Sequence, residues 1–311
     1  MDPTGGDAIG AAPIGSGATS QMRRLGVLGW PVAHSRSPAM MNAALRALGM
    51  DGDWRYQLLP VPPERFAETV RALGEAGFVG ANVTIPHKQA ALALADTASE
   101  RASAIGAANT LTFASGGKIE AENTDAAGFL TALDVDPRGL SAQVLGAGGS
   151  ARAVVWALRE SGVKGVAIWN RTPARAQELA HELGVTAVEH PSAADVLVNC
   201  TSVGLMSESA GEEGGGSSSE AATDAKDLRQ SASDTEALNK LELTFDQVGR
   251  YAHVVDLLYS SKATPLLAAA RAHGVHAVDG REMLVAQGAL SFELWTGVAP
   301  PRDVMRAALD G

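Results

Sequence analysis

Val144-Leu145-Gly146-Ala147-Gly148-Gly149-Ser150-Ala151 is the stretch of sequence that decides the fold. It spans the junction between an expected strand over 143–146 and an expected helix over 149–161. Glycines at such a junction permit a tight turn and let the backbone approach a pyrophosphate group at the helix N-terminus. We therefore expect a dinucleotide-binding unit, with the residues from Gly146 to Ala151 against the cofactor.

The next expected strand, 165–169, ends in Asn170-Arg171-Thr172, and Arg175 follows one helical step later. A site for NAD usually carries Asp or Glu here to hold the ribose 2′-hydroxyl group. A carboxylate would repel a 2′-phosphate group, whereas Arg171 can pair with it. This predicts NADP rather than NAD, the alternative being that Arg171 merely faces solvent.

Outward from this unit, strands and helices alternate along the chain. This pattern is typical of parallel sheets covered on both faces and predicts an α/β fold with two domains. The expected strands are 25–28, 56–61, 78–85, 143–146, 165–169, 194–199 and 253–258. The expected helices are 38–48, 149–161, 173–183, one opening at Thr264-Pro265, and 281–296.

Composition narrows the class of protein. A length of 311 residues suits two domains, and a formal charge of −10 argues against nucleic acid as a partner. No apolar run is long enough to span a bilayer, so we expect no membrane partner. The single cysteine, Cys200, excludes an intramolecular disulfide and a metal site built from cysteines, and we expect no metal.

Two segments are expected to be disordered, an N-terminal extension over 1–22 and an acidic insertion over 206–235. Both have too few large apolar residues to offset the entropy of ordering them. The extension lacks the order of a secretory signal, which makes the cytoplasm the default location.

Four polar strings follow or close apolar strands, where an α/β sheet presents groups to its cleft. Each also has a structural reading, as a helix cap, a turn or a surface ion pair between Lys88 and Asp125. The strings are His34-Ser35-Arg36-Ser37-Pro38, Asn82-Val83-Thr84-Ile85-Pro86-His87-Lys88, Ala108-Asn109-Thr110 and Glu122-Asn123-Thr124-Asp125.

Together with the glycine loop, these strings resemble the shikimate dehydrogenase family from about Arg24 to Gly297. Asp256-Leu-Leu-Tyr259 and the run from Gly280 to Gln287 match the family's last two signatures. Met41 replaces a common histidine, and His87 stands where an aromatic residue is frequent.

The resemblance implies a role for each matching residue. Lys88 and Asp125 would be catalytic, and both would also contact the substrate. The other expected contacts of shikimate or 3-dehydroshikimate are Ser35, Ser37, Thr84, Asn109, Tyr259 and Gln287. Besides the glycine loop and Asn170, Arg171, Thr172 and Arg175, the cofactor contacts would be Glu100, Leu257 and Gly280.

The resemblance also implies the chemistry and the division of the chain. Hydride delivery to the C3 carbonyl of 3-dehydroshikimate builds an alkoxide, which the Lys88 ammonium group can stabilise and protonate; whether Lys88 or Asp125 is the formal acid/base stays open. Residues 23–124 and 280–311 would form the substrate domain, and 125–279 the NADP-binding Rossmann domain. The sequence does not set the oligomeric state, for which a homodimer is one expectation.

Three other functions remain open at this point. A quinate/shikimate dehydrogenase would often prefer NAD, against which Arg171 speaks. A methylenetetrahydrofolate dehydrogenase would not explain the serines, which suit a small carboxylate. A non-catalytic NADP-binding sensor would be expected to have lost Lys88 or Asp125, and both are present.

Overall fold

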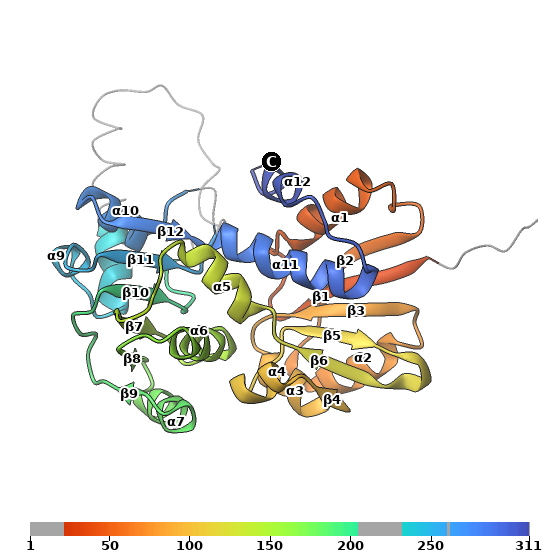
Figure 1. Ribbon diagram of the computed structural model, residues 1–311, viewed down its shortest axis with the longest axis horizontal. Helices are drawn as coiled ribbons and strands as arrows, with labels where there is room; N and C mark the ends of the chain where they lie inside the picture. The colour runs from red at the N-terminus through yellow and green to blue at the C-terminus, as the bar shows by residue number, and fades with distance from the viewer. Residues whose placement is uncertain (1–21, 205–231, 260–261, 311) are drawn as a thin grey trace, which may run out of the picture.

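The computed structural model describes residues 22–204, 232–259 and 262–310, which form two lobes built on one six-stranded sheet each (Figure 1). The first lobe contains the N-terminal sheet and the second contains the sheet formed by residues 141–279. Two helices, α5 (Asp125–Leu133) and α11 (Gly280–Thr296), run between the lobes and pack against each other (Figure 1). The expected α/β fold in two parts is confirmed.

The sheet of the second lobe is parallel throughout. Counted along the chain, its strands lie in the order 3-2-1-4-5-6, which is the order of a doubly wound dinucleotide-binding fold. In such a sheet, ligands bind at the carboxyl ends of the two central strands, where the order reverses. The strands are β7 (Ser141–Leu145), β8 (Gly165–Trp169), β9 (Thr186–Ala187), β10 (Val196–Asn199), β11 (His253–Asp256) and β12 (His276–Asp279).

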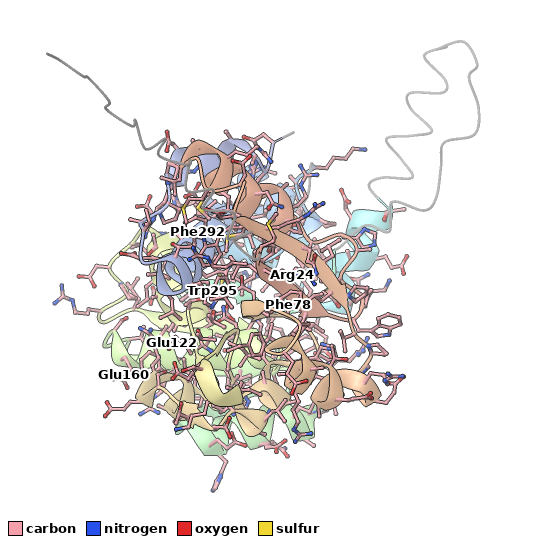
Figure 2. All side chains as sticks on the ribbon, turned by 90° about the vertical axis from the view of Figure 1, so that its right-hand side faces the viewer. Arg24, Phe78, Glu122, Glu160, Phe292 and Trp295 are labelled. Carbon is pink, nitrogen blue, oxygen red and sulfur yellow. The ribbon has the colours of Figure 1, made fainter. Side chains whose placement is uncertain are left out.

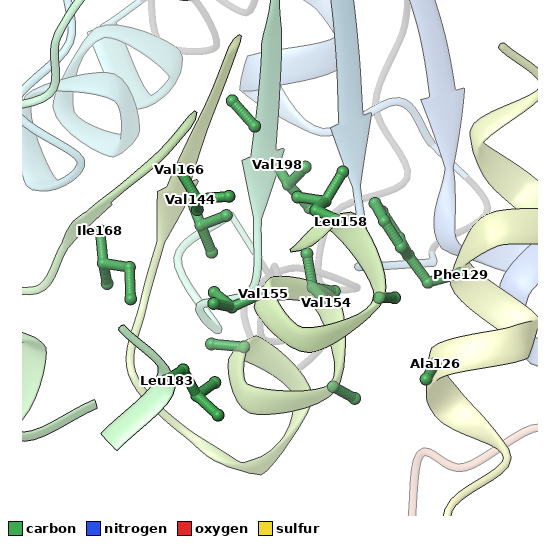
Figure 3. Packing of buried hydrophobic residues seen from close by; sticks show 14 of the residues in the cluster. Ala126, Phe129, Val144, Val154, Val155, Leu158, Val166, Ile168, Leu183 and Val198 are labelled. Carbon is green, nitrogen blue, oxygen red and sulfur yellow. The ribbon is translucent and has the colours of Figure 1, made fainter. Parts of the chain in front are cut away.

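Helices cover both faces of this sheet. On one face, α6 (Gly149–Glu160) and α7 (Pro173–Leu183) pack valines and leucines onto β7 and β8, as Figure 3 shows for Val154, Val155 and Val144. On the other face lie the helical residues 232–240, α9 (Phe245–Val248) and α10 (Pro265–Ala272).

The sheet of the first lobe is mixed, in the order β2-β1-β3-β5-β6-β4. The strands β1, β2 and β3 are mutually parallel, whereas β5 runs antiparallel to both β3 and β6. These strands are β1 (Arg23–Gly29), β2 (Trp54–Pro60), β3 (Phe78–Val83), β4 (Thr97–Ala98), β5 (Thr110–Phe113) and β6 (Ile119–Glu122).

The long helix α11 returns to this first sheet. Phe292 and Trp295 from α11 enter one core with α1, and the Trp295 ring donates to the Leu111 carbonyl oxygen at 3.1 Å (Figure 2). The opposite face carries a second core, with residues of α2 and α3. The helices of this lobe are α1 (Ser37–Ala47), η1 (Pro63–Arg65), α2 (Phe66–Leu73), α3 (Lys88–Leu94), α4 (Glu100–Ile105), η2 (Ser115–Gly117) and α12 (Arg302–Ala307).

The two segments expected to be disordered fall almost wholly outside the described residues, at 1–21 and 205–231. The expected insertion extended to residue 235, but residues 232–235 are already helical. Within the described residues, no helix has both the length and the apolar character that crossing a bilayer requires.

Candidate active site

Lys88 and Asp125 form an ion pair at the centre of the molecule. Lys88 is the first residue of α3 and Asp125 the first residue of α5, and Lys88 Nζ lies 2.7 Å from Asp125 Oδ2. Their side chains are only 10% and 6% exposed, which rules out a surface ion pair. Burying two charges costs several kcal/mol of desolvation per ion, by order of magnitude, so such a pair is weak evidence for stability. The buried position of this ion pair is better explained by a role in catalysis than by a contribution to stability.

Asn109 holds the second oxygen of the same carboxylate. Its Nδ2 donates to Asp125 Oδ1 at 2.8 Å, while its Oδ1 accepts from the Thr124 backbone at 2.7 Å. The Asn109 amide also donates to Gln287 Oε1 at 3.2 Å, which brings two expected substrate contacts together. In this arrangement, Asn109 orients Asp125 so that its other oxygen faces Lys88.

The same lysine lies against the glycine loop of the other lobe. Lys88 Nζ donates to Ser150 Oγ at 2.9 Å. A Cβ atom added to Gly149 would lie 2.7 Å from Lys88 Cβ, so only glycine leaves room for the lysine stem. The expected convergence of an ammonium group, a carboxylate and the dinucleotide loop is therefore present in the structure.

The glycine loop has the geometry that a pyrophosphate group needs. Gly146 has a φ of 106°, which side-chain-bearing residues rarely adopt, and its N–H donates to the Trp169 carbonyl oxygen at 2.7 Å. The loop opens α6 at the carboxyl end of β7, where the first N–H groups of a helix lack partners within it. Gly148 is exposed, whereas Ala147 and Ser150 are partly buried.

The turn after β8 presents its cations to solvent. Arg171, Thr172 and Arg175 are exposed, and Asn170 Nδ2 shapes the turn by donating to the Thr172 carbonyl oxygen at 2.9 Å. Two exposed guanidinium groups beside a glycine loop fit a dinucleotide that carries an additional phosphate group. The donor set of this edge therefore fits NADP.

Three further residues were expected at the cofactor. Leu257 and Gly280 adjoin at the carboxyl ends of β11 and β12, where the Gly280 N–H donates to the Leu258 carbonyl oxygen at 3.0 Å. Glu100 is exposed at the first position of α4 in the other lobe. The structure thus brings Leu257 and Gly280 together, whereas Glu100 belongs to the first lobe.

The side-chain hydroxyl groups of Ser35, Ser37, Tyr56 and Tyr259 form a second polar group in the first lobe and the loop after β11. Burial raises the pKa of Tyr259, while hydrogen bonds with the Ser35 side chain and the Arg36 backbone oppose this rise. Burial also raises the pKa of Tyr56, which hydrogen-bonds Ser37 and lies near Tyr259. Ser35, Ser37 and Tyr259 therefore converge as expected. Thr84 follows β3, with its N–H donating to the Leu28 carbonyl oxygen at 2.8 Å.

A buried polar network beneath these groups was not predicted. Tyr56 donates to Asn82 Oδ1 at 2.8 Å, and Asn82 Nδ2 donates to Ser291 Oγ at 2.9 Å. Ser291 Oγ also lies 3.2 Å from Oγ1 of Thr124, the residue before Asp125. One signal in the sequence was available, because Ser291 stands four residues after Gln287 and thus on the same face of α11.

The two departures from the family pattern have structural explanations. Met41 is fully buried in the core between α1 and α11. His87 stacks on Phe66 with ring centroids 4.3 Å apart, as an aromatic residue would, and its Nε2 lies 2.7 Å from the Val61 carbonyl oxygen. The hydrogen bonds of Lys88 Nζ go instead to Asp125 and Ser150.

Asp256 is a buried carboxylate that organises the loop leading to Tyr259. It accepts from Thr264 Oγ1 at 2.6 Å, from Asn199 Nδ2 at 3.0 Å and from the Leu258 N–H at 3.2 Å. Burial raises its pKa to about 6, although these hydrogen bonds act in the opposite direction. Burial likewise raises the pKa of the neighbouring Cys200 thiol, which makes a nucleophilic role unfavourable.

The Asp256→Asn variant is expected to gain stability over the wild type as the pH rises from 4 to 7. Because the folded-state pKa is raised above its ordinary value of 3.8 to about 6, the wild type loses stability through this window. The difference in unfolding free energy between Asp256→Asn and the wild type should change by up to about 3 kcal/mol over this pH range. Urea denaturation at each pH measures this difference. Asp195→Asn is the control variant, because hydrogen bonds from Ser141 lower the pKa of Asp195. The difference in unfolding free energy between this variant and the wild type should stay constant from pH 5 to 7. A constant difference for Asp256→Asn would contradict the raised pKa.

Known proteins resemble both lobes. Family models match residues 27–111 (shikimate dehydrogenase substrate binding domain), 134–207 (shikimate/quinate 5-dehydrogenase) and 280–309 (shikimate 5′-dehydrogenase C-terminal domain). A shikimate dehydrogenase (NADP(+)) of Paracoccus denitrificans is 42% identical, over 91% of this chain and 95% of its own length. One from Methanopyrus kandleri is also 42% identical, over 92% and 94%. Among solved structures, shikimate 5-dehydrogenase of Thermus thermophilus in complex with NADP(H) and shikimate matches with a TM-score of 0.75 at 38% identity, over 93% of this chain and 98% of that one.

Proposed function

The chain belongs to the shikimate dehydrogenase family, and on this premise we propose that its Lys88–Asp125 pair catalyses the reversible, NADP-dependent interconversion of 3-dehydroshikimate and shikimate. The single observation that carries the proposal is the position of Lys88. Its ammonium group, from the first lobe, contacts both the Asp125 carboxylate at the start of α5 and Ser150 of the glycine loop in the second lobe.

The chemistry follows from this position. Bound NADPH supplies the hydride for the C3 carbonyl carbon. The Lys88 ammonium group stabilises the negative charge that develops on the C3 oxygen and transfers a proton to it. Asp125, oriented by Asn109, pairs with the ammonium group and fixes its direction, and in the oxidative direction the pair takes the proton back. The remaining groups of the protein bind the substrate and the cofactor and align them for the reaction.

The polar groups around the pair suit the rest of the substrate. Hydroxyl groups of Ser35, Ser37 and Tyr259 can hold a small carboxylate without a cation, each by donating a hydrogen bond. We assign the ring hydroxyl groups of shikimate to Thr84, which follows β3, to Asn109, which precedes β5, and to Gln287 of α11. Asn109 hydrogen-bonds both Asp125 and Gln287.

We further propose that the two lobes divide the work. Residues 23–124 and 280–311 form the substrate domain, and residues 125–279 form the domain that binds NADP through the glycine loop, the Arg171 turn and Leu257. Gly280, at the boundary, would add a contact with the cofactor, and Asp125 and Tyr259 would add contacts with the substrate. Two observations support this division. Each part contains one of the two sheets, and the helices that run between the lobes, α5 and α11, begin at the two boundaries, residues 125 and 280. We also expect a homodimer. Sedimentation of the purified chain measures this oligomeric state.

The purified chain is expected to reduce NADP in the presence of shikimate, followed as absorbance of the reduced nicotinamide. Turnover with quinate and NAD should be much slower, because the Arg171 turn lacks the carboxylate that holds a ribose 2′-hydroxyl group. Binding of NADP without turnover of shikimate would contradict the proposal and favour a sensor. Faster turnover with quinate and NAD would favour the broader dehydrogenase.

A further inference from the structure

We propose that Ser150 is a positioning residue for Lys88, acting through its side-chain hydroxyl group rather than through the cofactor loop alone. This inference rests on the proposed function of the Lys88–Asp125 pair. Ser150 belongs to the loop expected to bind the pyrophosphate group, a role that needs only its backbone N–H. The side chain points instead at the lysine, with Lys88 Nζ 2.9 Å from Ser150 Oγ.

The number of donors on the ammonium group explains why a second acceptor matters. Lysine has three N–H donors that rotate freely about the end of a flexible stem. Asp125 Oδ2 takes one of them at 2.7 Å, and Ser150 Oγ takes another from the opposite lobe. When two N–H donors of Lys88 are held in place, the direction of the third is also set. This third donor is left for the reacting oxygen of the substrate.

The surroundings of Ser150 explain why this acceptor stands here. Gly149 and Ser150 are the first two residues of α6, whose N-terminus carries a partial positive charge that disfavours a neighbouring ammonium group. Because Gly149 has no side chain, the Lys88 stem packs directly on this turn. Ser150 Oγ gives the ammonium group a hydrogen-bond acceptor at this helix end. An alanine at 150 would leave Lys88 without it.

A split between kcat and cofactor binding is therefore expected. Ser150→Ala should lower kcat for shikimate oxidation about 10-fold, as expected for one hydrogen bond to a charged group. The KM for NADP, and the affinity for NADP measured by calorimetry without substrate, should change by less than about 2-fold because the backbone of the loop is intact. Ser150→Thr keeps the hydroxyl group and should restore kcat to within about 3-fold of the wild type.

Ser161→Ala is the matched control, at the other end of the same helix. The Ser161 hydroxyl group donates to the Ala157 carbonyl oxygen at 2.8 Å, away from Lys88, and its loss should leave kcat unchanged.

The outcomes separate this inference from the proposed function. A wild-type chain that does not turn over shikimate would overturn both. With an active wild type, unchanged kcat in Ser150→Ala would overturn the inference alone. So would a fall in kcat that comes with an equal loss of NADP affinity and that Ser150→Thr does not restore, because the serine would then act on the loop.

Discussion

Replacing Lys88 by methionine should lower kcat for shikimate oxidation by at least about 10²-fold, the typical contribution of a positioned acid/base group. Methionine keeps an unbranched stem to pack over Gly149 but removes the ammonium group. Without that group, nothing stabilises or protonates the oxygen at C3. The measurement is the initial rate of NADPH formation at saturating shikimate and NADP.

Stability has to be separated from catalysis in this variant. Lys88→Met leaves Asp125 buried without its partner, a situation that costs about 3 to 5 kcal/mol of folding free energy in other proteins. The double variant Lys88→Met/Asp125→Asn removes both charges and should fold but stay inactive. Lys118→Met, at an exposed position before β6, is the control and should retain wild-type kcat. Near-wild-type kcat in folded Lys88→Met would remove the lysine from the mechanism.

Replacing Arg171 by alanine should erase most of the preference for NADP. Loss of a charge-assisted pair with the 2′-phosphate group is expected to raise the KM for NADP by about 10- to 100-fold. The KM for NAD should change little, because NAD carries no phosphate group at that position. The measurement compares both cofactors at saturating shikimate.

Arg138→Ala is the control for this substitution. Arg138 is another exposed arginine of the same lobe, but it pairs with Asp136 at 2.7 Å and lies ahead of β7, so both KM values should stay at wild-type level. Arg175→Ala should fall between the two, since Arg175 lies one helical turn beyond Arg171. An unchanged preference in Arg171→Ala would show that its side chain only faces solvent.

Much of the second lobe was predictable because its signals are local, although β9, β12 and α9 were not expected. The strand 165–169 and the helix 173–183 were expected with the bounds that the structure has. Thr264 caps α10 as expected, accepting from the Leu267 N–H at 3.3 Å. The hairpin of β5 and β6 and the helix α5 were missed. Both strands are only four residues long, and polar strings at their ends obscure the alternation.

The site was predictable as a set of residues but not as a network. Polar strings after strands made Lys88, Asp125 and Asn109 candidates, and the resemblance to the family implied their roles. That Asn109 would orient Asp125 depends on the antiparallel pairing of β5 with β3 and β6, which local patterns do not encode. Tyr56 and Ser291 were missed for the same reason. They meet through Asn82 only because α11 returns from the end of the chain to the first sheet.

A crystal structure of the chain with NADP and shikimate bound would test the central claim most directly, by the distance from Lys88 Nζ to the C3 oxygen of shikimate. We expect a hydrogen bond of about 2.7 to 3.2 Å, with Asp125 still paired to the lysine and the nicotinamide ring facing C3. A substrate bound the other way round, with its carboxylate on Lys88 and its C3 hydroxyl group among Ser35, Ser37 and Tyr259, would contradict this account.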